Sequence, residues 1–183
     1  MKLASSPLAW RLDESLREVP LDPAALAREA DSRVEAIATM SSQPARLLAM
    51  LIEAAPLLRI AGRLEESRRT AAAAIAIAEL VEDEEGVYSG QLALAQVLQR
   101  EGQFALATPL YDRLVAQARS MPARAHRLHD VLFEAGRNLF DQGLGSQAAK
   151  CFRESQSLRR AAGRDDLLEA TAEAVRRASE TGR

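Results

Sequence analysis

The sequence predicts an all-α protein, a right-handed solenoid of stacked antiparallel helix hairpins that ends in a C-terminal capping helix. Three observations predict this fold. Gly62, Gly102 and Gly143 lie 40 and 41 residues apart, a period typical of repeats that consist of two helices. After each glycine, small or apolar residues recur at intervals of three or four, as on one face of a helix. No alternating run of β-branched residues is long enough to predict a strand.

Composition indicates closely packed helices. The chain has 183 residues, of which 48% are hydrophobic but only 4% are aromatic, so that alanine and leucine fill the core. A net charge of −2 does not indicate a polyanionic partner. Cys151 is the only cysteine, no apolar run approaches the length of a membrane span, and charges interrupt the start of the chain. We therefore expect a cytoplasmic protein without a membrane segment.

Prolines at the helix starts and the spacing of apolar residues predict the first four helices. Ser6-Pro7 opens the first, with Trp10, Leu12 and Leu16 as its buried side. Asp22-Pro23 opens the second, at about 23–40, and Gln43-Pro44 opens the third, at about 44–61. The fourth, at about 64–81, is rich in alanine.

Five further helices complete the chain. The acidic residues 82–85 precede the fifth helix, at about 87–101, where the helix dipole favours negative charge. The sixth spans about 104–119 after Gly102, and the seventh spans about 122–141 after Pro122. The eighth spans about 146–161 after Gly143 and Gly145, and Asp165-Asp166 caps a ninth, at about 166–179.

Spacing pairs these helices within a single domain of residues 1–183. The predicted units are a degenerate leading hairpin at 7–43, repeats at 44–81, 87–119 and 122–161, and a capping helix at 165–180.

The third hairpin carries the clearest motif. Gly136 stands in the middle of its first helix, Gly143 at the turn, and Ala148 and Phe152 inside its second helix. The second hairpin has Ala95, Gly102, Phe104, Ala107 and Tyr111 at these places, and the first has Ala55, Gly62, Leu64, Ser67 and Ala71. This pattern resembles the tetratricopeptide repeat (TPR) family, in a long-period variety of about 40 residues like those of kinesin light chains and of bacterial signalling regulators.

The resemblance implies a concave groove lined by the first helix of each hairpin, which would bind a peptide or protein segment. The register places Ile52, Leu92 and Phe133 in equivalent positions, as an apolar ladder. Arg59, Gln96 and Arg137 would lie beside it as polar anchors, and a groove with arginines suits a segment that carries some carboxylates. The candidate groove residues are Ile52, Pro56, Arg59, Leu92, Gln96, Gln99, Asp130, Phe133, Arg137 and Phe140.

Alternative interpretations remain for several of these residues. Phe133 and Phe140 either line the groove or pack against the capping helix or a second copy of the chain. Pro56 either shapes the groove or is a kink that sets the curvature. Open ends and apolar faces favour self-association into a homo-oligomer.

The sequence offers little for other kinds of site. His126 and His129 lie three residues apart, but no third ligand is spaced to complete a metal site, so ordinary surface histidines are favoured. Cys151 is interpreted as a buried structural thiol. We find no motif for a cofactor, for nucleic acid or for catalysis. We therefore predict a non-catalytic interaction module, with a ligand-responsive regulatory or sensor unit of a bacterial signalling or transcription-control system as the alternative.

Overall fold

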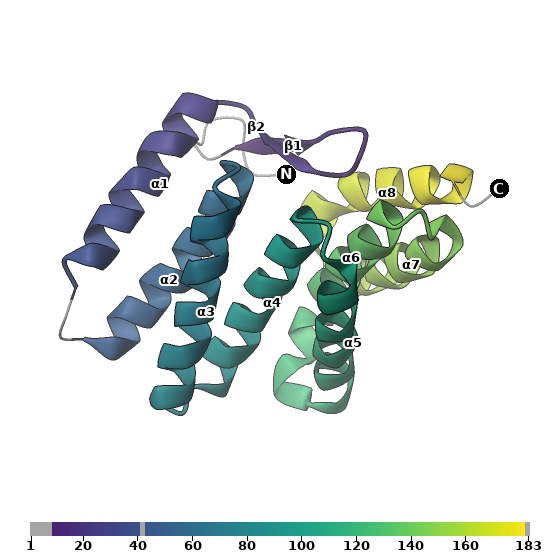
Figure 1. Cartoon of the computed structure of the whole chain (residues 1–183). Helices are drawn as coiled ribbons and strands as arrows, with labels where there is room; N and C mark the ends of the chain where they lie inside the picture. The colour runs from purple at the N-terminus through teal and green to yellow at the C-terminus, as the bar shows by residue number, and fades with distance from the viewer. Residues whose placement is uncertain (1–8, 41–42, 182–183) are drawn as a thin grey trace. The chain divides into compact units, whose positions relative to one another are not determined.

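The computed structural model describes residues 9–40 and 43–181. Within them the all-α prediction is confirmed, apart from one short hairpin (Figure 1). The elements are β1 (Trp10–Leu12), β2 (Glu18–Pro20), α1 (Pro23–Ala38), α2 (Pro44–Ile60), α3 (Leu64–Leu80), α4 (Glu84–Arg100), α5 (Phe104–Ser120), the 3₁₀ turn η1 (Pro122–Arg127), α6 (Leu128–Asp141), α7 (Gly145–Ala161), the 3₁₀ turn η2 (Asp165–Leu167) and α8 (Leu168–Thr181).

The predicted first helix is wrong. Its start at Pro7 lies outside the described residues, and residues 10–20 form a two-stranded sheet instead. Asp13 closes the turn, because its Oδ1 accepts hydrogen bonds from the backbone N–H groups of Ser15 and Arg17, both at 2.9 Å. Leu16 lies in the left-handed region, at φ +57°, which a helix does not tolerate. The leading hairpin of helices at 7–43 is therefore reduced to α1.

The three glycine corners are equivalent in their backbone geometry, as predicted. Gly62, Gly102 and Gly143 have φ values of +80°, +74° and +77°. Nothing lies within 4 Å of where their Cβ atoms would be, so that the backbone conformation, not space, requires glycine. Gly163 repeats the device at φ +66° between α7 and η2, a fourth corner that the sequence analysis missed.

The contacts divide the chain into two units. The N-terminal unit comprises residues 9–11 and 18–102, and the C-terminal unit comprises residues 12–17 and 103–181. The boundary after Gly102 falls inside the predicted repeat at 87–119, so that the pairing of α4 with α5 stays a prediction.

In the N-terminal unit, α2, α3 and α4 lie side by side and α1 contacts α2 (Figure 1). Small residues bring α4 close to its neighbours. A Cβ atom at Gly86 would lie 2.8 Å from Leu48 Cδ2 of α2, and one at Gly90 would lie 2.8 Å from Ile75 Cγ1 of α3. The predicted mid-helix small residues Ala55 and Ala95 are fully buried, at 1% and 0% exposed.

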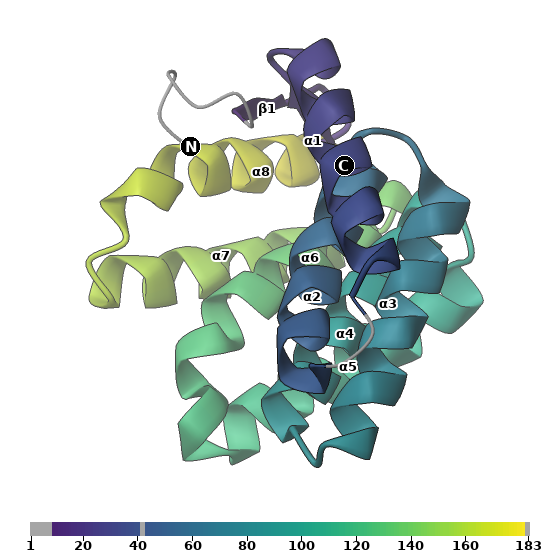
Figure 2. The same cartoon turned by 90° about the vertical axis from the view of Figure 1, so that its left-hand side faces the viewer.

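In the C-terminal unit, α6 contacts α5 and α7, and α7 and α8 lie side by side (Figure 2). Phe152 is fully buried at the centre of its core. A Cβ atom at Gly136 would lie 2.6 Å from Phe152 Cε1, so the helices meet closely at this small residue, as predicted. The predicted seventh helix starts as a 3₁₀ turn after Pro122 and becomes α-helical only at Leu128.

Candidate protein-binding site

The ten predicted groove residues all lie on α2, α4 and α6. Six of them are partly accessible to solvent: Ile52, Pro56, Leu92, Gln96, Asp130 and Phe140. The other four, Arg59, Gln99, Phe133 and Arg137, are buried. Ile52 and Leu92 belong to the N-terminal unit and Phe133 to the C-terminal unit, so the continuous apolar ladder stays a prediction.

Arg59, predicted as an anchor for a carboxylate of a partner, binds a carboxylate of its own chain. Its Nη1 donates to Glu18 Oε2 at 2.9 Å and its Nη2 to Glu18 Oε1 at 3.0 Å, so the pair is bidentate. The two side chains are only 5% and 7% exposed. The planar guanidinium fork matches the carboxylate in this arrangement. Sequence reasoning missed this pair, because it predicted a hairpin of helices for residues 7–43 and no strand there.

A cleft of about 540 Å³ lies in the N-terminal unit. Its apolar wall includes Pro56, which precedes Arg59 by three residues on α2, and Trp10 of β1. Arg33 and Glu53, which form an ion pair, supply its polar side. Neighbouring glutamates Glu29 and Glu53 hydrogen-bond the Arg33 guanidinium and raise its pKa above the ordinary value, although partial burial opposes this shift. The full lining is Trp10, Leu26, Arg33, Glu53, Pro56, Leu57 and Ile60.

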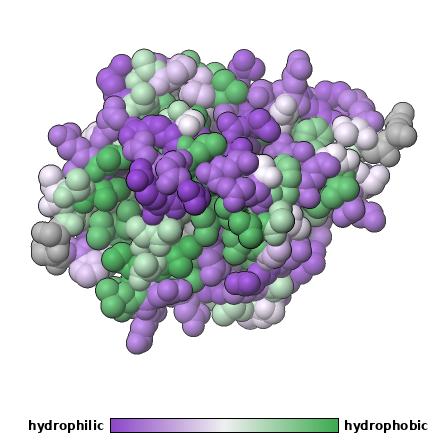
Figure 3. All heavy atoms as spheres, in the orientation of Figure 1, coloured by the Kyte–Doolittle hydropathy of each residue, from purple (hydrophilic) through white to green (hydrophobic). Residues whose placement is uncertain are grey.

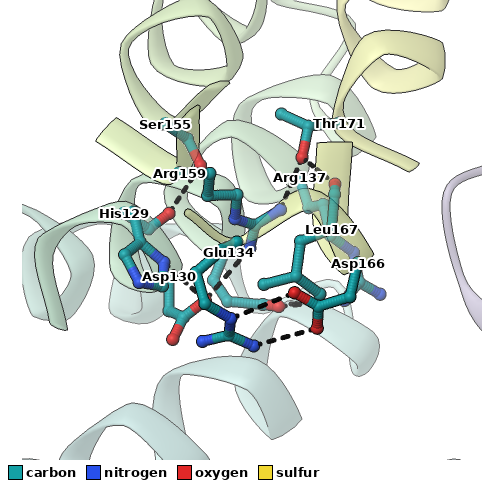
Figure 4. A network of polar contacts seen from close by, with 10 residues as sticks. His129, Asp130, Glu134, Arg137, Ser155, Arg159, Asp166, Leu167 and Thr171 are labelled. Atoms are coloured by element: carbon teal, nitrogen blue, oxygen red, sulfur yellow. Dashed lines mark hydrogen bonds and ion pairs between the residues drawn. The ribbon is translucent and has the colours of Figure 1, made fainter. Parts of the chain in front are cut away.

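The C-terminal unit contains a polar network centred on Arg159 of α7 (Figure 4). Arg159 is 4% exposed and donates from Nη1 to Thr171 Oγ1 at 2.6 Å and from Nη2 to Asp130 Oδ1 at 3.0 Å. Its guanidinium carbon also lies 4.5 Å from the centroid of the Phe133 ring. Asp130, predicted to line the groove, is therefore paired with a residue of its own unit.

Phe133 is a core residue of the C-terminal unit, which corrects its assignment as an open groove contact. It is 6% exposed, and its ring centroid lies 5.4 Å from that of Phe152. Phe140 packs against the same cluster, which includes Ala174 and Ala178 of α8. This arrangement matches the alternative in which both phenylalanines contact the capping helix.

Arg137 is also unlike an open anchor. It is 3% exposed, and its Nη1 lies 3.1 Å from Glu134 Oε2, one turn away on α6. Arg164 and Asp166, the latter labelled in Figure 4, form a further bidentate pair with both N–O distances at 3.1 Å.

His129 is buried, at 7% exposed, which corrects the prediction of two surface histidines, although His126 is exposed. Its backbone carbonyl accepts a hydrogen bond of 2.6 Å from Ser155 Oγ. Burial lowers the pKa of the His129 imidazole, and the charge of Asp130 at 2.9 Å opposes that shift. No group of three metal-ligating side chains gathers within the described residues.

Surface hydropathy and helix length indicate whether the described residues could contact a membrane. On the face turned to the viewer in Figure 3, hydrophobic residues lie among hydrophilic ones. In the part of the chain that the structure describes, no helix is long and apolar enough to cross a bilayer.

Comparison with known proteins supports the fold. No family model matches this sequence, and no curated protein matches it closely enough to indicate a relative. A crystal structure of nearly identical TPR-like repeats from Podosopora anserina, assigned to a kinesin light chain, aligns with a TM-score of 0.55 at 18% identity. The alignment covers 85% of this chain and 87% of that one. Together with the equivalent glycine corners, this likeness shows that the chain has the fold of TPR-like repeats.

Proposed function

We propose that this chain is a non-catalytic interaction module that binds a peptide or protein segment along α2 and α4. One observation carries the proposal. Ile52 and Leu92 hold positions 40 residues apart in the repeat, on two helices that contact each other, and both remain partly accessible. Partly exposed apolar side chains at repeated positions are typical of surfaces that bind other proteins.

The cleft that Pro56 of α2 helps to line adds to the argument. It places Trp10 and Pro56 next to the Arg33–Glu53 ion pair. Aromatic and arginine side chains are the residue types that contribute most at protein interfaces. A segment with a bulky apolar side chain would bury that side chain here while its backbone remained near polar groups.

The titratable groups of the C-terminal unit support binding over chemistry. Asp130 is paired with Arg159 of α7, and Glu134 with Arg137 on its own helix, so that each carboxylate has a partner within the unit. A catalytic carboxylate instead needs contact with a substrate.

The test is capture from a native extract with the tagged full chain and with an Ile52→Glu/Leu92→Glu variant. Leu80→Glu on α3 is the matched control, because Leu80 is 73% exposed and lies outside the proposed surface. Burial of one apolar side chain contributes about 1.5–3 kcal/mol, so the double variant should weaken binding by tenfold or more.

The wild-type chain and Leu80→Glu should capture the same partner. Circular dichroism and urea unfolding establish that the double variant is folded. If the folded double variant captures that partner as well as the wild type does, then the proposed surface is not the binding site.

A further inference from the structure

We propose that the segment bound by the N-terminal unit carries a lysine or arginine next to the apolar side chain that enters its cleft. The proposal rests on the binding function proposed above and names the chemistry of the partner at the same surface. The cleft lies between β1, α1 and α2, entirely within the N-terminal unit. Its apolar walls and the charges on its polar side together indicate which residues a partner needs.

The walls of the cleft are mainly apolar. Among its lining residues only Arg33 and Glu53 are charged. The volume of about 540 Å³ corresponds to about 18 water molecules at about 30 Å³ each, which is room for one large apolar side chain. The apolar lining consists of Trp10, Leu26, Pro56, Leu57 and Ile60.

Two carboxylates share one guanidinium on the polar side of the cleft. Arg33 Nε donates to Glu29 Oε1 at 2.8 Å, and Arg33 Nη1 donates to Glu53 Oε2, so the three side chains carry a net charge of −1. The Glu53 side chain is 59% exposed, and among the described residues no group other than Arg33 hydrogen-bonds it. A carboxylate accepts several hydrogen bonds, so Glu53 can also bind a cation that a partner supplies.

The surroundings of the cleft do not offset this negative charge. Arg59 follows Pro56 by one turn of α2, but Glu18 already binds its guanidinium at 2.9 and 3.0 Å. Within residues 9–11, 18–40 and 43–102 there are nine arginines, no lysine and fourteen Asp or Glu residues, a net charge of −5. Such a surface attracts a cationic segment and disfavours an acidic one. The charges therefore favour a basic partner, whereas the arginines of the sequence had suggested one with carboxylates.

Trp10 makes the cleft directly observable, because it is the only tryptophan of the chain and lines the cleft. The experiment titrates the full chain with three capped dipeptide amides, acetyl-Phe-Lys, acetyl-Phe-Gln and acetyl-Phe-Glu, and follows the fluorescence of Trp10. The probes share their apolar side chain and differ in the charge beside it. An exposed ion pair changes an affinity by up to about fivefold, so the lysine probe should bind about three- to fivefold more tightly than the glutamine probe. The glutamate probe should bind most weakly, and high salt should reduce these differences.

Three variants locate the charge that is recognised. Glu53→Gln leaves Arg33 paired with Glu29 alone, so the group becomes neutral and the preference for the lysine probe should disappear. Arg33→Gln leaves both carboxylates without their cation and should enlarge that preference. Glu35→Gln on α1 is the matched control, because Glu35 is exposed, loses the same charge and does not line the cleft. This control should keep the preference of the wild-type chain.

The outcomes separate this proposal from the binding function on which it rests. Equal affinities of the three probes for the wild-type chain would overturn the proposal, and so would a lysine preference that survives in Glu53→Gln. Absence of any response of Trp10 would show that the cleft does not accept an apolar side chain, which overturns it as well. Failure of the binding function is instead seen as unchanged capture by the Ile52→Glu/Leu92→Glu variant, whose substituted residues do not line the cleft.

Discussion

Replacement of Gly136 by alanine tests the helix packing on which the fold depends. The added Cβ would lie 2.6, 2.8 and 3.1 Å from three ring atoms of Phe152, whereas ordinary contacts begin at 3.4 Å. The ring cannot easily withdraw, because Phe152 is 0% exposed and Phe133 stands 5.4 Å away between ring centroids. Overpacking of this kind costs about 1–3 kcal/mol, while alanine gains about 1 kcal/mol over glycine in helix propensity. The two effects together predict a net loss of up to about 2 kcal/mol in the free energy of unfolding.

Urea unfolding followed by circular dichroism measures this loss. The matched background is Phe152→Leu, which removes the ring that the new methyl group meets. There Gly136→Ala should cost less, with a coupling energy of at least about 0.5 kcal/mol. If Gly136→Ala stabilises the protein equally in both backgrounds, then the close approach of α6 to α7 at this position is wrong.

Three further predictions concern other parts of the chain. Leu16→Ala should lower the free energy of unfolding by about 2–5 kcal/mol, because Leu16 is 0% exposed in the core of the C-terminal unit. Urea titration measures this loss, and a smaller loss would mean that Leu16 does not anchor the turn between β1 and β2 in that core. Ala95→Arg should lower the free energy of unfolding by about 3 kcal/mol or more, because the buried site, 0% exposed, has no room for a charged side chain. An unchanged thermal melting curve would contradict the repeat register. The pKa of His129 is lowered from its ordinary value of 6.5, so that the unfolded state binds a proton more readily. Stability should therefore fall as the pH drops below about 6.5 and level off below the folded-state pKa, and His129→Gln should remove that part of the pH dependence.

Much of the helical architecture could be predicted from local signals. Gly62, Gly102 and Gly143 adopt the left-handed conformation that a helix corner requires, and only glycine does so without strain. Asp22 caps α1, because its Oδ1 accepts a hydrogen bond of 2.8 Å from Ala25 N. Such effects involve residues a few positions apart, so the sequence carries them directly.

The N-terminal hairpin could not be predicted in this way. The spacing of Trp10, Leu12 and Leu16 is compatible with one face of a helix. It is equally compatible with a β-hairpin whose turn buries Leu16. What separates the two is Glu18, which is stabilised by Arg59 at a separation of 41 residues. Local sequence propensities do not indicate the Glu18–Arg59 ion pair, because this ion pair forms only when α2 packs next to β2.

The candidate site shows the same division. The periodicity placed Ile52, Leu92 and Phe133 on one face of their helices, but it could not tell which of them remains accessible. Phe133 is covered by Arg159 from the next helix, at 4.5 Å from its ring centroid. Burial of a side chain is decided by its neighbours in space, and these come from other elements.

By itself, the sequence determined that this protein consists of helix pairs with glycine corners and small residues at the helix contacts, because each of these features is set by backbone conformation and spacing along one chain. Only the tertiary structure decided that Arg59 binds Glu18 and that Phe133 belongs to a core. Those outcomes depend on contacts between residues tens of positions apart, whose free energy exists only when the helices have packed.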